Sequence, residues 1–361
     1  MRLAFLGLSA SGKTTLFNAL TGAHVSVGTY SGAGSEIRVG RIGVPDDRLE
    51  VIRNLFHPKK VTPAVVEVVD TVPLALAAHE NREGNPRLIA TLREAHGIVI
   101  VVRAFGSDRV PHPRESVDPL RDLNDLRTEF VVADLDIVEK RVTKLQRDIS
   151  RGHAGPNDPK ELAALQRCRQ ELDAGRGVTG AKLNPEEKKL LSSFAFLTMK
   201  PILVVLNVGE EVLVGKVRRA WDNRHFAGLP WLEICAEWEM EVHELPKEEW
   251  ETYLAEVGIE EPCSGPFVRA AYQMMDLVTF FTCNENELRA WQLPRYSTAV
   301  DAAAAVHTDM ARGFIRAEVI AVEDLKKFGS VKDVRTHGKE RLEGKTGPVH
   351  DGDLIYFRFS V

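Results

Sequence analysis

The feature that most constrains the fold is a glycine-bracketed loop near the start of the chain. GLSASGKT, residues 7–14, follows the pattern G-x-x-x-x-G-K-[ST]. It stands between a short apolar run at 2–6, which we interpret as a strand, and residues 14–21, whose apolar side chains share one helical face. Between a strand and a helix, such a loop lets backbone N–H groups surround phosphate oxygens, and the helix N-terminus favours an anion. The pattern predicts a phosphate-binding loop that opens an α/β domain.

The residues of this loop have separate chemical roles. Lys13 would reach the β- and γ-phosphates of a nucleotide, and the Thr14 hydroxyl would ligate Mg²⁺. Lys13 would also neutralise charge during an in-line attack of water on the γ-phosphate, so we predict a catalytic role for it. The residues that we predict to bind nucleotide here are Gly7, Ser9, Ala10, Ser11, Gly12, Lys13, Thr14 and Thr15.

Short apolar, β-branched runs predict the remaining strands of a sheet. Each run is too short for a buried helix and is bounded by turn or polar residues. The predicted strands are residues 2–6, 65–69, 98–103 and 202–206. The helical segments that alternate with them are residues 14–21, 86–95 and 212–221. This alternation is typical of a parallel sheet covered on both faces, so we expect the α/β fold class.

An acidic residue closes the second of these strands. Asp70 follows VVEVV and lies where a carboxylate would bind Mg²⁺, directly or through water. Thr14 and Asp70 are therefore the predicted ligands of a Mg²⁺ cofactor. The alternative for Asp70 is an ordinary turn or N-cap aspartate.

A base-reading site is expected after a later strand. Asn207 and Glu210 follow ILVVL in the pattern N-V-G-E. GTPases of the Ras type carry N-K-x-D there, in which the aspartate accepts two hydrogen bonds from guanine and the lysine stem covers the base. Without the lysine, and with a longer acid, the assignment of guanine weakens. The segment EICAEWE would add backbone contacts near the base through Cys235 and Ala236.

The middle of the chain has a helical rather than an alternating pattern. A heptad seam is formed by Leu135, Val138, Val142, Leu145 and Ile149. After the loop at 152–159 the same spacing continues, with one polar break, at Leu162, Leu165, Arg169 and Leu172. The pattern predicts an inserted antiparallel helical hairpin, and two ordinary core-packing helices are the alternative.

The C-terminal part predicts a separate β-rich domain. VTFFTC, GFIRAEVI and LIYFRF alternate like half-exposed strands, and HDGD supplies a turn. The expected division is a nucleotide-binding domain at 1–133 and 195–277, a hairpin at 134–194 and a last domain at 278–361.

Composition excludes several classes of protein. The chain has 361 residues, of which 44% are hydrophobic and 27% charged, as in soluble globular proteins. No apolar run is long enough to span a membrane, and the N-terminus does not read as a signal peptide. The four cysteines lack metal spacing, so we expect free thiols in a reducing cytoplasm. A net charge of −5 gives no global attraction to nucleic acid.

Taken together, these residues resemble the YchF branch of the Obg-like, translation-factor-related P-loop NTPases. The similarity spans nearly the whole chain and begins with GLSASGKTTLFNALTG. It continues through VPDDRLEVIRNLFHPKKVTPAVVEVVD, VVRAF, VDPLRDLNDLRTEFVVADLDIVEKR and N-V-G-E. AWQLPRYSTAVDAAAAVHTDMARGFIRAEVI and EGKTGPVHDGDLIYFRF resemble the family's TGS domain very closely.

The resemblance implies a P-loop NTPase sheet with an inserted antiparallel hairpin and a C-terminal α+β TGS domain of β-grasp type. It also implies a Mg²⁺ cofactor, ATP or GTP as the nucleotide, a cytoplasmic location and contact with the ribosome or rRNA. N-x-x-E in this family goes with a preference for ATP or a relaxed choice. No membrane contact is expected, and the sequence indicates no oligomeric state.

The chain departs from the family pattern at the predicted reaction centre. The second switch should read D-x-x-G, but its last position is Pro73, which has no N–H and a fixed φ. Leu74 takes the place of the water-orienting glutamine of Ras-like enzymes, as is normal in the family, and is the second predicted catalytic residue. Ala10 replaces an asparagine that helps related NTPases hold potassium, so no strong potassium activation is expected. Gly34 stands where the first switch should carry its Mg²⁺-binding threonine.

Two functions remain open from the sequence. The first is a Mg²⁺-dependent purine nucleotide-binding protein with slow or impaired hydrolysis, acting at the ribosome in translation or stress regulation. The alternative is a non-hydrolysing binding module, in which nucleotide is a structural ligand and the hairpin and TGS domain bind the ribosome or RNA.

Overall fold

The computed structural model divides into two compact units. It describes residues 1–23, 37–75, 85–213, 221–226, 228–256, 258–259 and 261–360. The larger unit comprises residues 2–40 and 67–263, and the smaller comprises Met1, 41–66 and 264–361.

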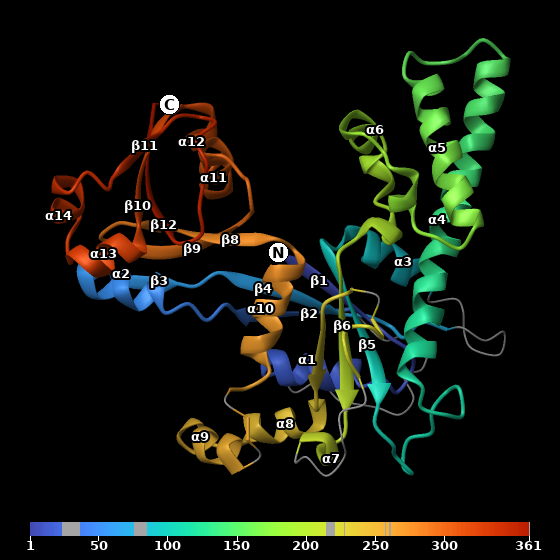
Figure 1. Cartoon of the computed structure of the whole chain (residues 1–361), viewed down its shortest axis with the longest axis horizontal. Coiled ribbons are helices and arrows are strands. Elements are labelled where there is room, and N and C mark those ends of the chain that lie inside the picture. The colour runs from blue at the N-terminus through green and yellow to red at the C-terminus, as the bar shows by residue number, and fades with distance from the viewer. Residues whose placement is uncertain are drawn as a thin grey trace. The chain divides into compact units, whose positions relative to one another are not determined.

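A six-stranded sheet organises the first part of the fold, in the order β2-β4-β1-β5-β6-β7. Five of its strands, β1, β2, β4, β5 and β6, are labelled in Figure 1. Its strands are β1 (Arg2–Leu6), β2 (Arg38–Gly43), β4 (Val65–Asp70), β5 (Gly97–Ala104), β6 (Ile202–Val208) and β7 (Trp231–Ile234). The five strands from β4 to β7 are parallel. The four predicted strand runs are thus confirmed, and so is the α/β class, because buried parallel strands read as continuous apolar runs.

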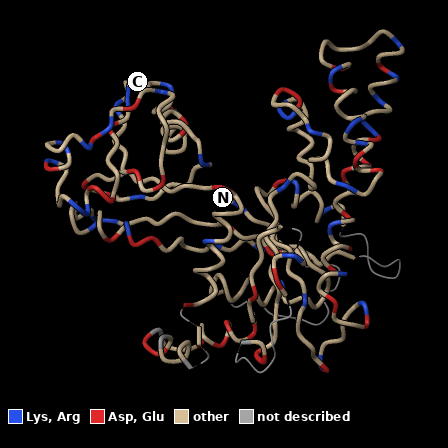
Figure 2. Tube along the Cα trace, in the orientation of Figure 1, with Lys and Arg blue, Asp and Glu red and all other residues tan. Residues whose placement is uncertain are grey.

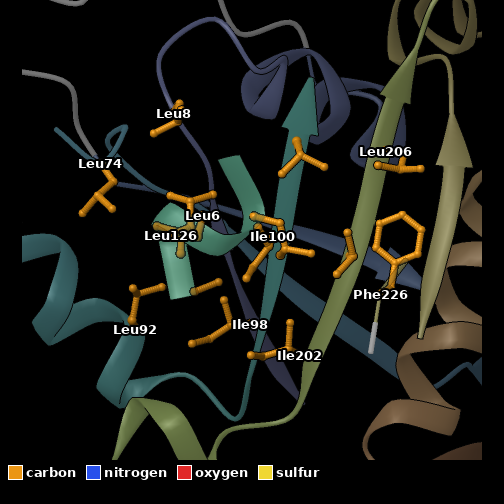
Figure 3. Close-up of a cluster of buried hydrophobic side chains, with 14 of the residues drawn as sticks. Leu6, Leu8, Leu74, Leu92, Ile98, Ile100, Leu126, Ile202, Leu206 and Phe226 are labelled. Atoms are coloured by element: carbon orange, nitrogen blue, oxygen red, sulfur yellow. The ribbon is translucent and has the colours of Figure 1, made fainter. Parts of the chain in front are cut away.

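Helices and apolar side chains cover this sheet. The helices of this part are α1 (Lys13–Thr21), α3 (Asn85–Glu94), α7 (Glu210–Leu213), α8 (Ala236–Glu244) and α9 (Lys247–Glu256). One face carries a core in which Leu6, Ile98 and Ile100 of the strands pack with Leu92 of α3 and Leu126 of the next helix (Figure 3). The predicted helix at 14–21 is confirmed as α1 and that at 86–95 as α3. Of the helix predicted at 212–221, residues 214–220 lie outside the described part of the chain.

Two long helices form the predicted antiparallel hairpin, α4 (Pro119–Ser150) and α5 (Asp158–Asp173) (Figure 1). Asp118 caps α4 by accepting from the backbone N–H of Arg121. Val138, Val142 and Leu145 are buried in a separate core. The prediction that Arg169 occupies a seam position was wrong by one residue. Cys168 is buried in the seam, and the Arg169 side chain is 48% exposed. A charged guanidinium stays in solvent, while a thiol packs as a small hydrophobe.

Short helical turns lead from the hairpin back to the sheet. They are η2 (Val178–Ala181), α6 (Pro185–Leu190), η3 (Ser192–Phe194) and η4 (Leu197–Met199). Asn184 and Glu187 form a reciprocal capping box at the start of α6.

The smaller unit is built on a second six-stranded sheet, in the order β11-β10-β12-β8-β9-β3. Its strands are β3 (Lys60–Thr62), β8 (Leu277–Cys283), β9 (Glu287–Pro294), β10 (Phe314–Ala321), β11 (Arg341–Glu343) and β12 (Asp353–Phe359). Its helices are α2 (Arg48–Phe56), α10 (Ser264–Met274), α11 (Ala299–Val306), α12 (Thr308–Arg312), α13 (Val322–Phe328) and α14 (Val331–Thr336). The strand-like segments predicted after residue 278 are confirmed as β8, β10 and β12.

The compact units group the chain differently from the predicted domains. Residues 41–66 belong with the C-terminal part because β3 pairs in parallel with β9, from Lys60 opposite Glu287 to Thr62 opposite Arg289. Residues 264–277 also belong with it. The division into a nucleotide domain, a hairpin and a TGS domain stays a proposal.

Candidate nucleotide site

The glycine-bracketed loop has a conformation that requires its glycines. Gly12 has φ +86° and stands at the N-terminus of α1, where no side chain caps the helix. A Cβ on Gly12 would lie 2.0 Å from Nδ2 of Asn207, and a Cβ on Gly7 would lie 2.4 Å from the Val101 carbonyl oxygen. Ala10 also has a left-handed backbone, at φ +58°. The loop thus presents its backbone N–H groups and an open helix N-terminus, which suit an anion.

Lys13 is buried within the loop. Its Nζ donates to the carbonyl oxygens of Gly7 and Leu8, at 3.0 Å in each case. Burial lowers the pKa of Lys13 to about 8, although the charge of Asp70 acts in the opposite direction. The carbonyl oxygens of the loop therefore accept the hydrogen bonds that the ammonium would donate to a bound phosphate.

The predicted metal ligands are in contact with each other. The Thr14 hydroxyl donates to Oδ2 of Asp70 at 2.9 Å, which joins the start of α1 to the end of β4. Asp70 is 5% exposed, burial raises its pKa, and its Oδ1 is without a partner among the described residues.

The side-chain oxygen atoms of Thr14 and Asp70 fit a magnesium ion. Hydroxyl and carboxylate oxygens are the ligands that Mg²⁺ prefers, and it is usually held by one or two of them plus substrate phosphates. In the described part of the chain, no group of three or more His, Cys, Asp or Glu side chains forms a metal cage. A site made of Thr14, Asp70 and phosphate oxygens agrees with both observations.

The segment after Asp70 is hydrogen-bonded to β1 and to the start of the phosphate loop. The Thr71 hydroxyl donates to the Phe5 carbonyl, and the N–H of Leu74 donates to the Gly7 carbonyl at 3.2 Å. The Leu74 side chain is buried in the core beside the sheet. Since Pro73 has no N–H, neither residue 73 nor residue 74 presents a backbone donor to a γ-phosphate in this arrangement.

Asn207 joins the loop to the predicted base-reading segment. Its Nδ2 donates to the Ser11 carbonyl at 3.1 Å, and its Oδ1 accepts from the N–H of Ala236 at 3.1 Å. Cys235 precedes α8 and is buried, which raises its thiol pKa to about 11, and the charge of Glu210 adds to that shift. Glu210 is exposed at the start of α7. The structure thus brings all four predicted base-side residues to one end of the loop.

The remaining predicted loop residues differ in exposure. Ser9 is exposed, Thr15 is half-buried, and Ser11 is buried with its Oγ without a partner among the described residues. Gly34, the predicted first-switch position, lies outside the described residues.

Sequence reasoning missed Arg103, at the end of β5. Arg103 is opposite Asn207 in the register of β5 and β6 and is 2% exposed. The signal was a single charged residue closing the otherwise apolar run IVIVV. Arg103 thus places a buried guanidinium at the C-terminal end of the strand next to that of Asn207.

Two protein-family models match this chain, one in its N-terminal part and one in its C-terminal part. A family model described as 50S ribosome-binding GTPase matches residues 2–139. A second model, the YchF-GTPase C-terminal family, described as a protein of unknown function, matches residues 277–360. No helix among the described residues is long and apolar enough to cross a membrane.

Individual relatives cover the whole chain. It is 36% identical to the "Ribosome-binding ATPase YchF" of Haemophilus influenzae, over 100% of this chain and 99% of the relative. It is 34% identical to the protein of the same name in Bacillus subtilis, over 99% of this chain and 98% of the relative. The solved structure of the Schizosaccharomyces pombe YchF GTPase has a similar fold, with a TM-score of 0.84 at 24% identity, covering 99% of this chain and 97% of that one.

Proposed function

Since this chain belongs to the YchF family, we propose that it is a Mg²⁺-dependent purine nucleotide-binding protein that hydrolyses ATP or GTP slowly and acts at the ribosome. The observation that carries the proposal is the joined set of phosphate loop, Lys13, Thr14 and Asp70. The names of the relatives support the ribosome as partner. A cytoplasmic location and a part in translation or stress regulation belong to the same proposal.

The residues of the site divide the work of binding. The loop N–H groups and the N-terminus of α1 would hold the phosphates, and Lys13 would leave its loop carbonyls for the β- and γ-phosphates. Thr14 and Asp70 would hold Mg²⁺, which supplies charge neutralisation on the phosphates when bound. Asn207, Cys235 and Ala236 would contact the base of the nucleotide. Glu210 would border the base-binding region at the protein surface. ATP and GTP both remain candidates.

Slow hydrolysis follows from the segment after Asp70. A γ-phosphate sensor needs a backbone donor at position 73, which Pro73 lacks. The neighbouring Leu74 N–H is engaged by Gly7, and the Leu74 side chain is buried, so its predicted catalytic role would require it to move. The same observation favours the alternative of a non-hydrolysing binding module.

Nucleotide binding is the first test of the proposal. Calorimetry with ATP, ADP, GTP and GDP, with and without Mg²⁺, should show binding that Mg²⁺ strengthens. A chain that binds none of the four would contradict the proposal. Co-sedimentation with ribosomes, with and without the preferred nucleotide, tests the partner.

Single-turnover hydrolysis then separates the two functions. We expect a slow rate in the wild type and a rate about tenfold or more higher in Pro73→Gly, because one hydrogen bond to a charged phosphate is regained. Pro63→Gly, an exposed proline in the segment that leads into β4, is the matched control. Binding without turnover in both the wild type and Pro73→Gly would leave the non-hydrolysing module as the function.

A further inference from the structure

Arg103 lies at the C-terminal end of β5, whose neighbour β1 leads into the phosphate loop. It is opposite Asn207 in the parallel register of β5 and β6, and residues on neighbouring strands in register point to the same face. Val101, two residues earlier in β5, has its carbonyl oxygen close to Gly7, since a Cβ on Gly7 would lie 2.4 Å from it. Arg103 thus shares a face with Asn207, on a strand whose backbone approaches the start of the loop.

The guanidinium of Arg103 is buried without a charged partner. Its Nε donates to the Phe105 carbonyl at 3.1 Å and its Nη2 to the Val110 carbonyl at 2.9 Å, and it lies 4.5 Å from the centroid of the Phe105 ring. Its Nη1 is buried with no partner among the described residues. In the same part of the chain, no carboxylate lies within ion-pair distance of it, and Asp122 is engaged by His112 at 2.9 Å and Arg121 at 2.8 Å.

A buried cation of this kind needs compensation. Taking a guanidinium out of water costs several kcal/mol unless an opposite charge or enough acceptors meet it, and two carbonyls satisfy only part of its five donors. Ser11 Oγ and Asp70 Oδ1 are also buried without partners, and both belong to the same nucleotide site. Asp70 and Arg103 close the strands β4 and β5, and Ser11 lies in the loop after β1, which stands between them in the sheet. Three such groups at the ends of neighbouring strands indicate a polar ligand.

The position of Arg103 identifies the part of the ligand that it faces. In the strand order, Asp70 of β4 and Asn207 of β6 lie on opposite sides of the loop, and Arg103 is on the Asn207 side. Val208, which stands where N-K-x-D proteins have lysine, is buried in the hydrophobic core. Position 208 therefore offers no cation, and Arg103 places one at the end of the neighbouring strand.

We propose that Arg103 is a nucleotide-binding residue whose Nη1 donates to an acceptor on the nucleoside half of a purine nucleotide. The inference rests on the proposed function and extends it, because it separates recognition of the nucleoside from recognition of the phosphates. Arg103 then contributes to affinity for ATP and GTP and contributes nothing to a bare phosphate chain.

Comparing nucleotides with inorganic tripolyphosphate tests the proposal. The Mg²⁺ complexes of ATP, GTP and tripolyphosphate are titrated into the wild-type full chain, Arg103→Gln and Arg103→Lys. Arg103→Gln should weaken ATP or GTP about tenfold or more, as the loss of a charged hydrogen bond does. The affinity of Arg103→Gln for tripolyphosphate should stay within about twofold of the wild type. The affinity of Arg103→Lys for ATP or GTP should lie between those of the wild type and Arg103→Gln. Arg109→Gln, an exposed arginine in the loop after β5, is the control and should change neither.

Other results of this comparison would contradict either the role of Arg103 or the proposed function. Equal losses for ATP and tripolyphosphate, or no loss for either, would show that Arg103 only supports the loop after β5. If thermal melts show that Arg103→Gln does not fold, the same comparison in Arg103→Lys decides between these results. A wild-type chain that binds tripolyphosphate and nucleotides equally well would overturn the inference alone. A wild-type chain that binds none of them would overturn the proposed function, and the inference with it.

Discussion

Lys13 is hydrogen-bonded to carbonyl oxygens of its own loop, and nucleotide binding must break these bonds. Burial lowers its pKa to about 8, so the ammonium loses its proton at a lower pH than an ordinary lysine does. A bound triphosphate would favour the charged form and raise this pKa. Binding should therefore take up a proton, and affinity should be fully present below pH 8 and fall as pH rises through that value. Calorimetry at pH 8.5 in two buffers of different ionisation enthalpy should give an uptake of about half a proton or more.

The control for this prediction is Lys13→Arg. Arginine stays charged at every accessible pH, so proton uptake should disappear even if affinity changes. An uptake that is the same in Lys13→Arg and in the wild type would assign the proton to another group and contradict the prediction.

At the scale of elements, a buried carboxylate fastens the base of the hairpin. Asp134 of α4 is 0% exposed and accepts from Arg93 Nη1 at 3.0 Å and from the N–H groups of Leu197 and Thr198 at 3.0 and 2.9 Å. One side chain thus joins α4, the end of α3 and the return to β6. Asp134→Ala would remove the charged partner of Arg93, which keeps only carbonyl acceptors, and would leave the N–H groups of Leu197 and Thr198 without this acceptor. The loss should cost about 3 kcal/mol or more in the free energy of unfolding.

Asp136→Ala, two residues along the same helix, is the matched control. Its side chain is 56% exposed and, among the residues that the structure describes, forms an ion pair only with Lys140, one turn away, at 2.6 Å. An exposed pair of this kind contributes about 0.5 kcal/mol or less. Urea unfolding followed by circular dichroism should separate the two variants clearly, and similar losses would refute the role given to Asp134.

The sequence predicted elements better than their contacts. The strands β1, β4, β5 and β6 and the hairpin were foreseen because apolar runs and heptads report local periodicity. At the second helix the spacing from Leu165 allows either residue 168 or residue 169, and only packing shows that Cys168 faces the seam. The pairing of β3 with β9 joins residues more than 200 positions apart, and no local pattern encodes it.

The candidate site shows the same limit. The loop, Asp70 and Asn207 carry recognisable patterns, and the structure brings them to one edge of the sheet. The hydrogen bond from Leu74 to Gly7 could not be read from the sequence, because it depends on how β4 and the loop meet. Arg103 was missed because a charged residue after IVIVV also reads as an ordinary strand end.

At the scale of the whole molecule, the proposed nucleotide contacts all belong to one compact unit. The loop, Asp70, Arg103, Asn207 and Ala236 lie within residues 2–40 and 67–263. The other unit has its own core, in which Phe280, Ala302 and Ile355 are buried. Where two units have separate cores, a ligand stabilises the one that binds it, and the other gains only as far as the two unfold together.

Hydrogen exchange with and without nucleotide should therefore distinguish the two units. At a nucleotide concentration of about 100 times Kd, binding stabilises the folded unit by about 2.7 kcal/mol, or roughly a hundredfold in its opening equilibrium. Peptides from β5 and β6 should exchange about that much more slowly, and peptides from β8 and β10 should be unchanged. Lys13→Ala, which removes the phosphate ligand, should abolish the protection. Equal protection of β8 and β10 would show that the two units unfold as one, which would overturn the prediction.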